Sequence, residues 1–247
     1  MKKKQIPMLI GRNVVIEALR EGRPIDKVFV QLNLGGDLLR EIRELADRQD
    51  IPVSKVPVQK LDRLSRGNHQ GVIAMTAPVA YQKLEDLIPF FYEQGITPLI
   101  LLLDGVTDVR NFGAIARSAE VLGAHAIVIP VKNSAPVSSD AVKTSAGALL
   151  RIPVCRTNNW KETLKTLRMN GIRIYAAEGQ TSKQIREIDW TQPAALILGA
   201  EDKGLSGDSL RNADELVKIP QFGGTESLNV SVACGIILYE AARQRSG

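Results

Sequence analysis

The sequence is poor in the residues that build metal centres and disulfide frameworks. Among its 247 residues it has two cysteines, Cys155 and Cys234, and two histidines, His69 and His125. At most one disulfide can form, and no group of Cys and His has the spacing of metal ligands. A disulfide-rich secreted domain and a Cys/His metal centre are therefore excluded, and no metal is expected.

Aromatic residues and long apolar runs are also scarce. Aromatics make up 4% of the chain, so a broad aromatic platform for stacking nucleobases is not expected. The longest apolar run, from Pro98 to Leu103, is far too short to cross a bilayer. Lysines at positions 2–4 resemble the start of a signal peptide, but no adequate apolar segment follows before Gly11. We expect a cytoplasmic protein that does not enter a membrane.

Positive charge is concentrated at one end of the chain. Residues 1–78 contain 14 Lys/Arg and 9 Asp/Glu, whereas residues 79–247 contain 18 of each. A basic first segment (residues 1–78, called the head below) followed by a neutral second segment favours a polyanionic partner that binds mainly to the head. Charge alone is explained at least as well by an ordinary solvated surface.

The head has the pattern of a small α/β domain. Val14–Leu19 and Asp37–Asp50 have apolar residues at helical spacing, and Lys27–Val30, Ile51–Val53 and Gly71–Met75 are predicted strands. Residues 79–98 are predicted to form a linker that carries a short helix, Leu84–Tyr92. We therefore expect a first domain over residues 1–78 and a second over residues 99–247.

The second segment alternates apolar runs with helical stretches. The runs suit strands that are buried on both faces of a parallel sheet, and they are Leu99–Leu103, Ala126–Ile129, Arg173–Ala177, Ala194–Leu198 and Leu216–Ile219. The expected helices are Phe112–Leu122, Ser139–Leu150, Asn159–Met169 and Ser227–Arg243. This order predicts an open parallel α/β sheet with its ligand at the carboxyl ends of the strands. The last helix is apolar nearly all round, so it is either deeply buried or packs against a second subunit.

Three loops after predicted strands contain most of the candidate functional residues. In the first, Asn111 can cap a helix, Gly113 allows another segment to approach closely, and Arg117 follows one turn later. An ion pair between Arg117 and Glu120 explains the arginine better than catalysis does when the loop is considered alone.

The second loop, Leu198–Leu205, places two glycines around an acidic pair, which suits a loop whose backbone faces a small ligand, although a plain tight turn is also possible. Neither a phosphate-binding loop nor a dinucleotide-binding glycine motif occurs in the chain. In the third loop Ser227 is a natural helix cap, whereas Asn229 in the first turn needs a partner if it is buried.

Together the three loops resemble one family, the SpoU/TrmH class of knotted RNA ribose methyltransferases. The resemblance is carried by three motifs, Asn111–Ala119, Gly199–Gly204 and Ser227–Ala233, in the family's order. Gly11–Leu19 and His69–Val72 look like the L30e-like substrate-binding domain of the branch that methylates a 23S rRNA guanosine. Gln221 and Gly224-Thr225 depart from the family pattern at the rim of the expected pocket.

The resemblance implies a SPOUT-type sheet with a deep trefoil knot, bound S-adenosylmethionine, and a homodimer formed through the C-terminal helix. The knot would be an exception to the rule against threaded chains. It implies cofactor contacts from the second and third loops, by Leu198, Gly199, Gly204, Ile219 and Leu228. It also implies the catalytic residues Asn111, Arg117, Glu201, Ser227 and Asn229. An arginine normally stays protonated, so Arg117 either acts as a base with help from a phosphate or stabilises the emerging alkoxide.

The expected substrate is structured RNA, because only RNA carries a 2′-hydroxyl. Basic and polar residues of the head are the predicted RNA contacts: Arg12, Arg20, Arg23, Lys27, Arg63, Arg66, His69 and Gln70. A purely structural turn at His69-Gln70 is about equally plausible. The alternatives are a tRNA 2′-O-methyltransferase of the same fold and a non-catalytic RNA-binding protein. The four polar motif residues Asn111, Arg117, Glu201 and Asn229 disfavour the second.

Overall fold

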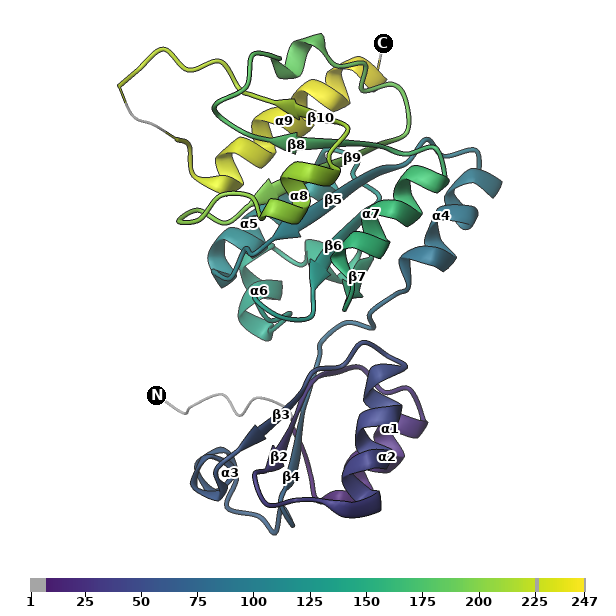
Figure 1. Cartoon of the computed structure of the whole chain (residues 1–247), viewed down its shortest axis with the longest axis vertical. Helices are drawn as coiled ribbons and strands as arrows, with labels where there is room; N and C mark the ends of the chain where they lie inside the picture. Colours follow the sequence, from purple (N-terminus) through teal and green to yellow (C-terminus); the bar gives the residue numbers. More distant parts are fainter. Residues whose placement is uncertain (1–7, 225–226, 247) are drawn as a thin grey trace. The chain divides into compact units, whose positions relative to one another are not determined.

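The computed structural model describes residues 8–224 and 227–246. The chain divides into two compact units (Figure 1). Of the described residues, the first unit comprises 8–80 and 137–139, and the second comprises 81–136, 140–224 and 227–246. Each unit has its own sheet and its own apolar core.

The first unit is a mixed four-stranded sheet with three helices. In chain order the elements are β1 (Met8–Ile10), α1 (Arg12–Arg20), β2 (Ile25–Gln31), α2 (Gly36–Asp47), β3 (Val53–Val56), α3 (Val58–Leu64) and β4 (Val72–Thr76). The strand order is β1-β4-β2-β3, with β2 and β3 parallel and the other pairs antiparallel. This unit has the α/β character expected of the head, although β1 and α3 are not predicted from the sequence.

The two faces of this sheet are covered unequally. Residues of α1 and α2, including Val15 and Ile42, pack with Val28 and Val72 of the sheet in a large core. The opposite face has only a small cluster, formed where Leu61 of α3 covers part of the sheet. The alternation of side chains along each strand therefore gives one closed face and one partly open face.

The second unit contains a six-stranded sheet and its flanking helices. Its elements are α4 (Leu84–Glu93), β5 (Leu99–Asp104), α5 (Val109–Val121), β6 (Ala126–Pro130), α6 (Ser139–Thr144), η1 (Ala148–Leu150), β7 (Val154–Thr157), α7 (Trp160–Met169), β8 (Arg173–Ala177), η2 (Ile185–Glu187), β9 (Ala194–Gly199), α8 (Gly207–Asn212), β10 (Glu215–Val217) and α9 (Val230–Arg245). The strand order is β10-β8-β9-β5-β6-β7, and every pair is parallel. The predicted parallel α/β sheet is confirmed.

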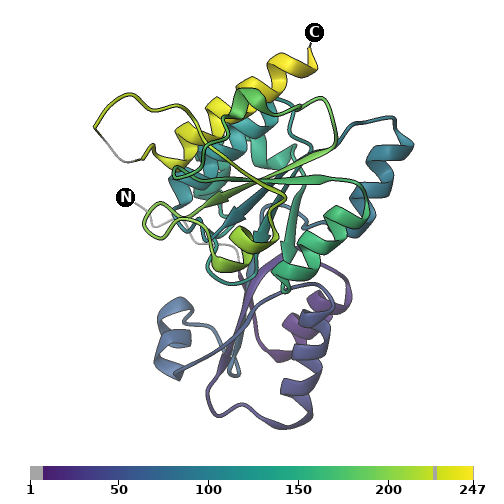
Figure 2. The ribbon, with the colours of Figure 1, turned by 45° about the horizontal axis from the view of Figure 1, so that its top comes forward.

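Helices cover both faces of this sheet. On one face, α4 and α7 join a single apolar core with alternate residues of the strands (Figures 1 and 2). On the other face, α5 and α9 pack against each other. The segment expected to be a linker thus includes α4, whose Leu84, Leu87, Ile88 and Phe91 are buried in the core of the second unit.

Local backbone geometry corrects two helix predictions. The expected helix Ser139–Leu150 is interrupted because Ala146 and Gly147 adopt positive φ angles of 50° and 81°, so α6 ends at Thr144. The last helix begins at Val230 rather than Ser227. The close approach predicted at Gly113 is confirmed, since a Cβ there would lie 2.6 Å from the Thr144 Cβ atom.

Within residues 8–224 and 227–246, no helix combines the length and apolar character that a membrane crossing requires. The trefoil knot implied by the family resemblance stays a prediction.

Candidate active site

Three neighbouring strands, β8, β9 and β10, end at one cavity of about 770 Å³. Open parallel sheets bind ligands at the carboxyl ends of their strands, because the loops that follow the strands meet there. All five residues predicted to hold the cofactor line this cavity: Leu198, Gly199, Gly204, Ile219 and Leu228.

The loop after β9 requires glycine at its first position. A Cβ on Gly199 would lie 2.4 Å from the carbonyl carbon of Gly204 and 2.6 Å from the amide nitrogen of Leu205. Reciprocal backbone hydrogen bonds between Ala200 and Gly204, of 3.0 and 2.8 Å, close the loop. Gly204 adopts φ +64°, where other L-residues are strained. The two motif glycines therefore fix the path of the backbone along the cavity.

The cavity combines apolar surface with negative charge. Val217, Val230 and Ile237 contribute apolar lining, and Glu178 and Glu201 bring carboxylates. Its volume lies within the range of roughly 300–1,000 Å³ that small-molecule sites occupy. It suits a nucleoside-sized ligand that carries positive charge.

Asn229 joins two of the motif loops through its side-chain amide. Its Nδ2 donates to Asn111 Oδ1 at 3.1 Å and to Glu201 Oε1 at 3.2 Å. Asn111 Nδ2 donates to Glu201 Oε2 at 3.0 Å and completes a triangle. The Asn229 Oδ1 atom accepts from the Ser231 amide at 2.9 Å and from the Ser231 hydroxyl at 2.6 Å. The structure thus brings together three of the five predicted catalytic residues, which we call the amide–carboxylate cluster (Asn111, Glu201 and Asn229).

A second hollow of about 390 Å³ adjoins the cluster at Asn111 and Glu201. Asn111 and Glu201 line it, together with residues of the loop that follows β5, such as Thr107. Glu201 and Val230 line both hollows. The two hollows are therefore neighbours that share Glu201 of the amide–carboxylate cluster.

The helix caps differ from the sequence prediction. Asp108, not Asn111, caps α5, with its Oδ1 accepting from the amides of Arg110 and Asn111 at 2.8 Å each. Asn229, not Ser227, caps α9. Ser227 is exposed and lines the larger cavity. With Asp108 as the cap, the Asn111 side chain is free to join the cluster.

Arg117 does not reach the cluster within one chain. It lies six residues beyond Asn111 on α5, and at 100° per residue the two side chains point to different sides of the helix. Arg117 is exposed, and among the described residues it forms no hydrogen bond or ion pair. The expected pair with Glu120 is absent because Glu120 binds Arg151 at 2.6 Å. The Arg151 guanidinium lowers the pKa of the Glu120 carboxyl.

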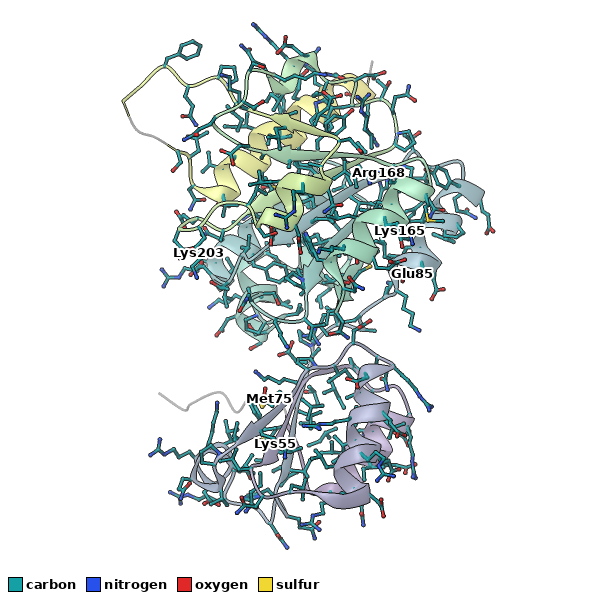
Figure 3. All side chains as sticks on the ribbon, in the orientation of Figure 1. Lys55, Met75, Glu85, Lys165, Arg168 and Lys203 are labelled. Carbon is teal, nitrogen blue, oxygen red and sulfur yellow. The ribbon has the colours of Figure 1, made fainter. Side chains whose placement is uncertain are left out.

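A hydrogen-bonded relay centred on the buried Ser209, which sequence reasoning missed, supports the loop that follows β9. Asp104 Oδ2, at the end of β5, accepts from the Ser206 amide at 2.7 Å and from the Ser209 hydroxyl at 2.6 Å. Trp160 Nε1 donates to the fully buried Ser209 Oγ at 2.8 Å. The relay ties β5 to the start of α8, just beyond Lys203 of the glycine loop (Figure 3). The sequence signal that could have identified Asp104 is its position as a polar residue at the end of an apolar strand.

In the first unit, His69 is held in a structural turn. Its Nδ1 accepts from the Gly71 amide at 2.9 Å, and its Nε2 lies 3.0 Å from Asp62 Oδ1. Arg12 Nε donates to the Gln70 carbonyl at 2.7 Å, and Gln70 adopts a positive φ of 49°. These hydrogen bonds favour a role of the His69 ring in holding the turn over a role in contacting RNA.

The predicted basic contacts of the head fall into two groups. Arg20 pairs with Glu41 at 2.5 Å, and Arg23 pairs with Glu21 at 2.7 Å. Three others form no ion pair among the described residues: Lys27, Arg63 and Arg66. In the same described part of the chain, no group of three His, Cys, Asp or Glu side chains could hold a metal ion.

Two family models match the chain. The SpoU rRNA Methylase family model matches residues 98–239, and a model for RNA 2′-O ribose methyltransferase substrate binding matches residues 8–82. The first match contains all three motif loops of the candidate site. The second contains the whole first sheet.

Similar proteins extend over nearly the whole chain. The putative TrmH family tRNA/rRNA methyltransferase YacO of Bacillus subtilis is 36% identical over 98% of both chains. The SpoU methyltransferase AviRb of Streptomyces viridochromogenes, solved in complex with AdoMet, has a TM-score of 0.62 and 28% identity, covering 97% of this chain and 91% of that one. An AdoMet-bound rRNA methyltransferase from Sinorhizobium meliloti has a TM-score of 0.60 and 29% identity, with coverage of 96% and 86%.

A shorter structure matches only part of the chain. The TrmH/SpoU tRNA modifying enzyme of A. aeolicus has a TM-score of 0.56 and 31% identity, and it covers 66% of this chain and 84% of its own. The family-model match over residues 98–239 and the AdoMet-bound neighbours agree with the cavity and the motif loops described above. The chain therefore belongs to the SpoU rRNA methylase family and is an S-adenosylmethionine-dependent RNA methyltransferase.

Proposed function

We propose that this protein methylates the ribose 2′-hydroxyl of a nucleotide in structured RNA, most specifically a guanosine of 23S rRNA. The observation that carries the proposal is the amide–carboxylate cluster, whose Glu201 lines both a cofactor-sized cavity and a second hollow. In this arrangement the larger cavity holds the methyl donor and the smaller one receives the target ribose.

The larger cavity fits S-adenosylmethionine. Backbone groups at Gly199 and Ile219 can bind a neutral adenosine, and the carboxylates of Glu178 and Glu201 favour the positive charge of the cofactor. We therefore propose that Leu198, Gly199, Gly204, Ile219 and Leu228 form the cofactor site.

The cofactor supplies a methyl group on a sulfonium, so the protein has little covalent chemistry to perform. The ribose oxygen must approach the methyl carbon in line, and most of the rate enhancement comes from this positioning. Asn111, Glu201 and Asn229 hold one another by three hydrogen bonds and thereby present a fixed polar edge to the sugar. Ser227, exposed at the rim of the cavity, is proposed to contact the bound substrate.

The 2′-hydroxyl must also lose its proton. We assign this part of the reaction to Arg117, either as a base assisted by a phosphate or as the group that stabilises the alkoxide. Since Arg117 faces away from the cluster of its own chain, it serves the reaction in a homodimer. Arg117→Ala should abolish methyl transfer while S-adenosylmethionine still binds, and near-normal turnover would remove Arg117 from the mechanism.

Exposed apolar side chains support a homodimer through α9. Val232, Ile236 and Tyr239 lie at helical spacing and are 50%, 36% and 63% exposed. Val121 at the end of α5 is 69% exposed. The face of α9 that points away from the core is apolar, like the face that packs against it. We therefore propose that a second copy of the chain buries this exposed face.

One whole-length neighbour supports rRNA as the substrate, whereas YacO, named as a tRNA/rRNA methyltransferase, is compatible with either RNA. The rRNA methyltransferase of Sinorhizobium meliloti covers 96% of the chain, whereas the A. aeolicus tRNA modifying enzyme covers 66%. We infer that the first unit selects the larger RNA, in the cytoplasm where ribosomes are assembled. The A. aeolicus match keeps tRNA as the second candidate.

Mapping of ribose methylation in cells with and without the protein tests this proposal. We expect one 2′-O-methylguanosine of 23S rRNA to disappear when the protein is absent. Unchanged rRNA together with a missing ribose methyl in tRNA would establish the second candidate.

A further inference from the structure

The helix-covered face of the first sheet is unsuited to a polyanion. α2 carries four carboxylates and two arginines. Arginines on this side are matched by nearby acids, as in the pairs Arg20–Glu41 and Arg40–Asp37. RNA approaching this face would meet the carboxylates of α2, and two of the arginines on this side, Arg20 and Arg40, are already paired.

The opposite, partly open face has a different character. Strand register places Lys27 of β2 and Met8 of β1 on either side of Met75 of β4, and Met75 extends from the open face of the sheet (Figure 3). Phe29 follows Lys27 by two residues and therefore lies on the same face. Phe29, Met8 and Met75 are only partly buried, because α3 covers one part of this face. Apolar surface is thus accessible beside lysines.

Two lysines lie over the Phe29 ring in cation–π contacts. The Lys27 Nζ atom lies 5.3 Å from the ring centroid, and the Lys60 Nζ atom, from α3, lies 5.1 Å from it. Arg63 is one turn beyond Lys60 on α3, and Arg66 follows the helix. Among the described residues none of these four cations forms an ion pair. The carboxylate of α3, Asp62, is bonded to His69.

We propose that this open face is the surface on which the first unit binds RNA. We define it as the Phe29 face, with the residues Lys27, Phe29, Lys60, Arg63 and Met75. Its cations bind consecutive phosphates, and the Phe29 ring supports one unpaired base. The arrangement suits a locally single-stranded segment, since the two lysines can turn from the ring to the flanking phosphates and a base can then stack on the ring. The inference rests on the proposed function and adds the contact surface, with three residues that the sequence did not predict: Phe29, Lys60 and Met75.

Salt dependence of binding by the full-length protein tests the electrostatic part. The probe is an unmodified 23S rRNA transcript, and its affinity is measured by filter binding between about 50 and 200 mM salt. Each lost phosphate contact should reduce the slope of log K against log[salt] by about 0.7–0.9. We expect Lys27→Gln with Lys60→Gln to lower the slope by about 1.4–1.8. The matched control, Arg40→Gln with Arg43→Gln on α2, removes the same charge from the other face and should leave the slope unchanged.

A third variant tests the stacking role of the ring. Phe29→Leu keeps an apolar side chain against Leu61 and Ile73, so the small core beneath it persists. It should weaken RNA binding by about ten-fold without a change in salt slope, because stacking involves no counterion release. Thermal unfolding and S-adenosylmethionine affinity should match the wild type.

The outcomes separate this inference from the function on which it rests. An equal or larger loss of slope in the Arg40/Arg43 control would overturn the Phe29 face while RNA methylation stands. Wild-type affinity of the Phe29→Leu variant would remove the stacking role. Failure of the unaltered protein to bind the transcript at any salt concentration would overturn both the face and the proposed 23S rRNA substrate.

Discussion

Replacement of Asn229 separates helix capping from the organisation of the reaction site. Its Oδ1 accepts two hydrogen bonds from Ser231, and its Nδ2 donates to Asn111 and Glu201. Asn229→Asp keeps the acceptor that caps α9 but loses both donated bonds. Asn229→Ala loses both functions. The two variants therefore differ in stability but share the defect in the cluster.

The contacts of Asn229 set the expected changes in Tm and kcat. Loss of an N-cap costs about 1 kcal/mol, so Asn229→Ala should lower Tm by about 2–4 °C in a chain of this size. In Asn229→Asp the repulsion from Glu201, about 1 kcal/mol for exposed charges, is offset by the favourable position of an acid at a helix N-terminus. Its Tm should stay within about 2 °C of the wild type. Both variants should lose about 100-fold in kcat, because the sugar is no longer held in line.

Single-turnover methyl transfer, calorimetric S-adenosylmethionine binding and thermal unfolding are measured on the same preparations. We expect cofactor affinity within about three-fold of the wild type for both variants. A near-normal kcat in Asn229→Asp would refute the argument, since the donated hydrogen bonds would then be unnecessary for transfer. Equal Tm values for the two variants would refute the capping assignment.

Three further perturbations follow from individual contacts. Gly199→Ala should reduce S-adenosylmethionine affinity at least ten-fold, because the new Cβ lies 2.4 Å from backbone atoms. Gly204→Ala meets no atom within 4 Å and should cost only the strain of its positive φ. Calorimetry that finds the larger loss of affinity in Gly204→Ala would contradict the loop geometry. Burial, and to a smaller extent the charge of Arg245, lower the pKa of His125 from its ordinary 6.5. The stability that the neutral ring contributes is therefore complete above pH 6.5 and is lost as the pH falls further, so Tm should drop between pH 7 and 5. The same drop in a His125→Gln variant would show that His125 is not its cause. Ile236→Glu should convert the proposed dimer to a monomer in sedimentation, and an unchanged mass would place the interface elsewhere.

The sheet of the second unit could be predicted because its strands are buried on both faces. Leu99–Leu103 and Ala194–Leu198 form continuous apolar runs that alternate with helical stretches, and both became central strands. β1, with three residues, and β7, with four, are too short to produce such a run. The break after α6 depends on positive φ at Ala146, and alanine gives no signal for that conformation.

The candidate site was predictable in its members but not in their geometry. The motif positions identified the residues that line the cavity and form the cluster. Local spacing could not show that Asp108 takes the cap and frees Asn111, because both residues are good caps. Helical spacing puts Asn111 and Arg117 on different sides of α5, but it could not reveal which of these sides meets the glycine loop. Long-range packing decides such choices.

The nucleoside product of the purified protein tests the central claim most directly. The protein is incubated with methyl-labelled S-adenosylmethionine and unmodified 23S rRNA, and the RNA is digested to nucleosides for mass spectrometry. We predict label on the ribose of one 2′-O-methylguanosine, reduced about 100-fold in Asn229→Asp. Label on a base, or no label in RNA although the cofactor binds, would contradict the account.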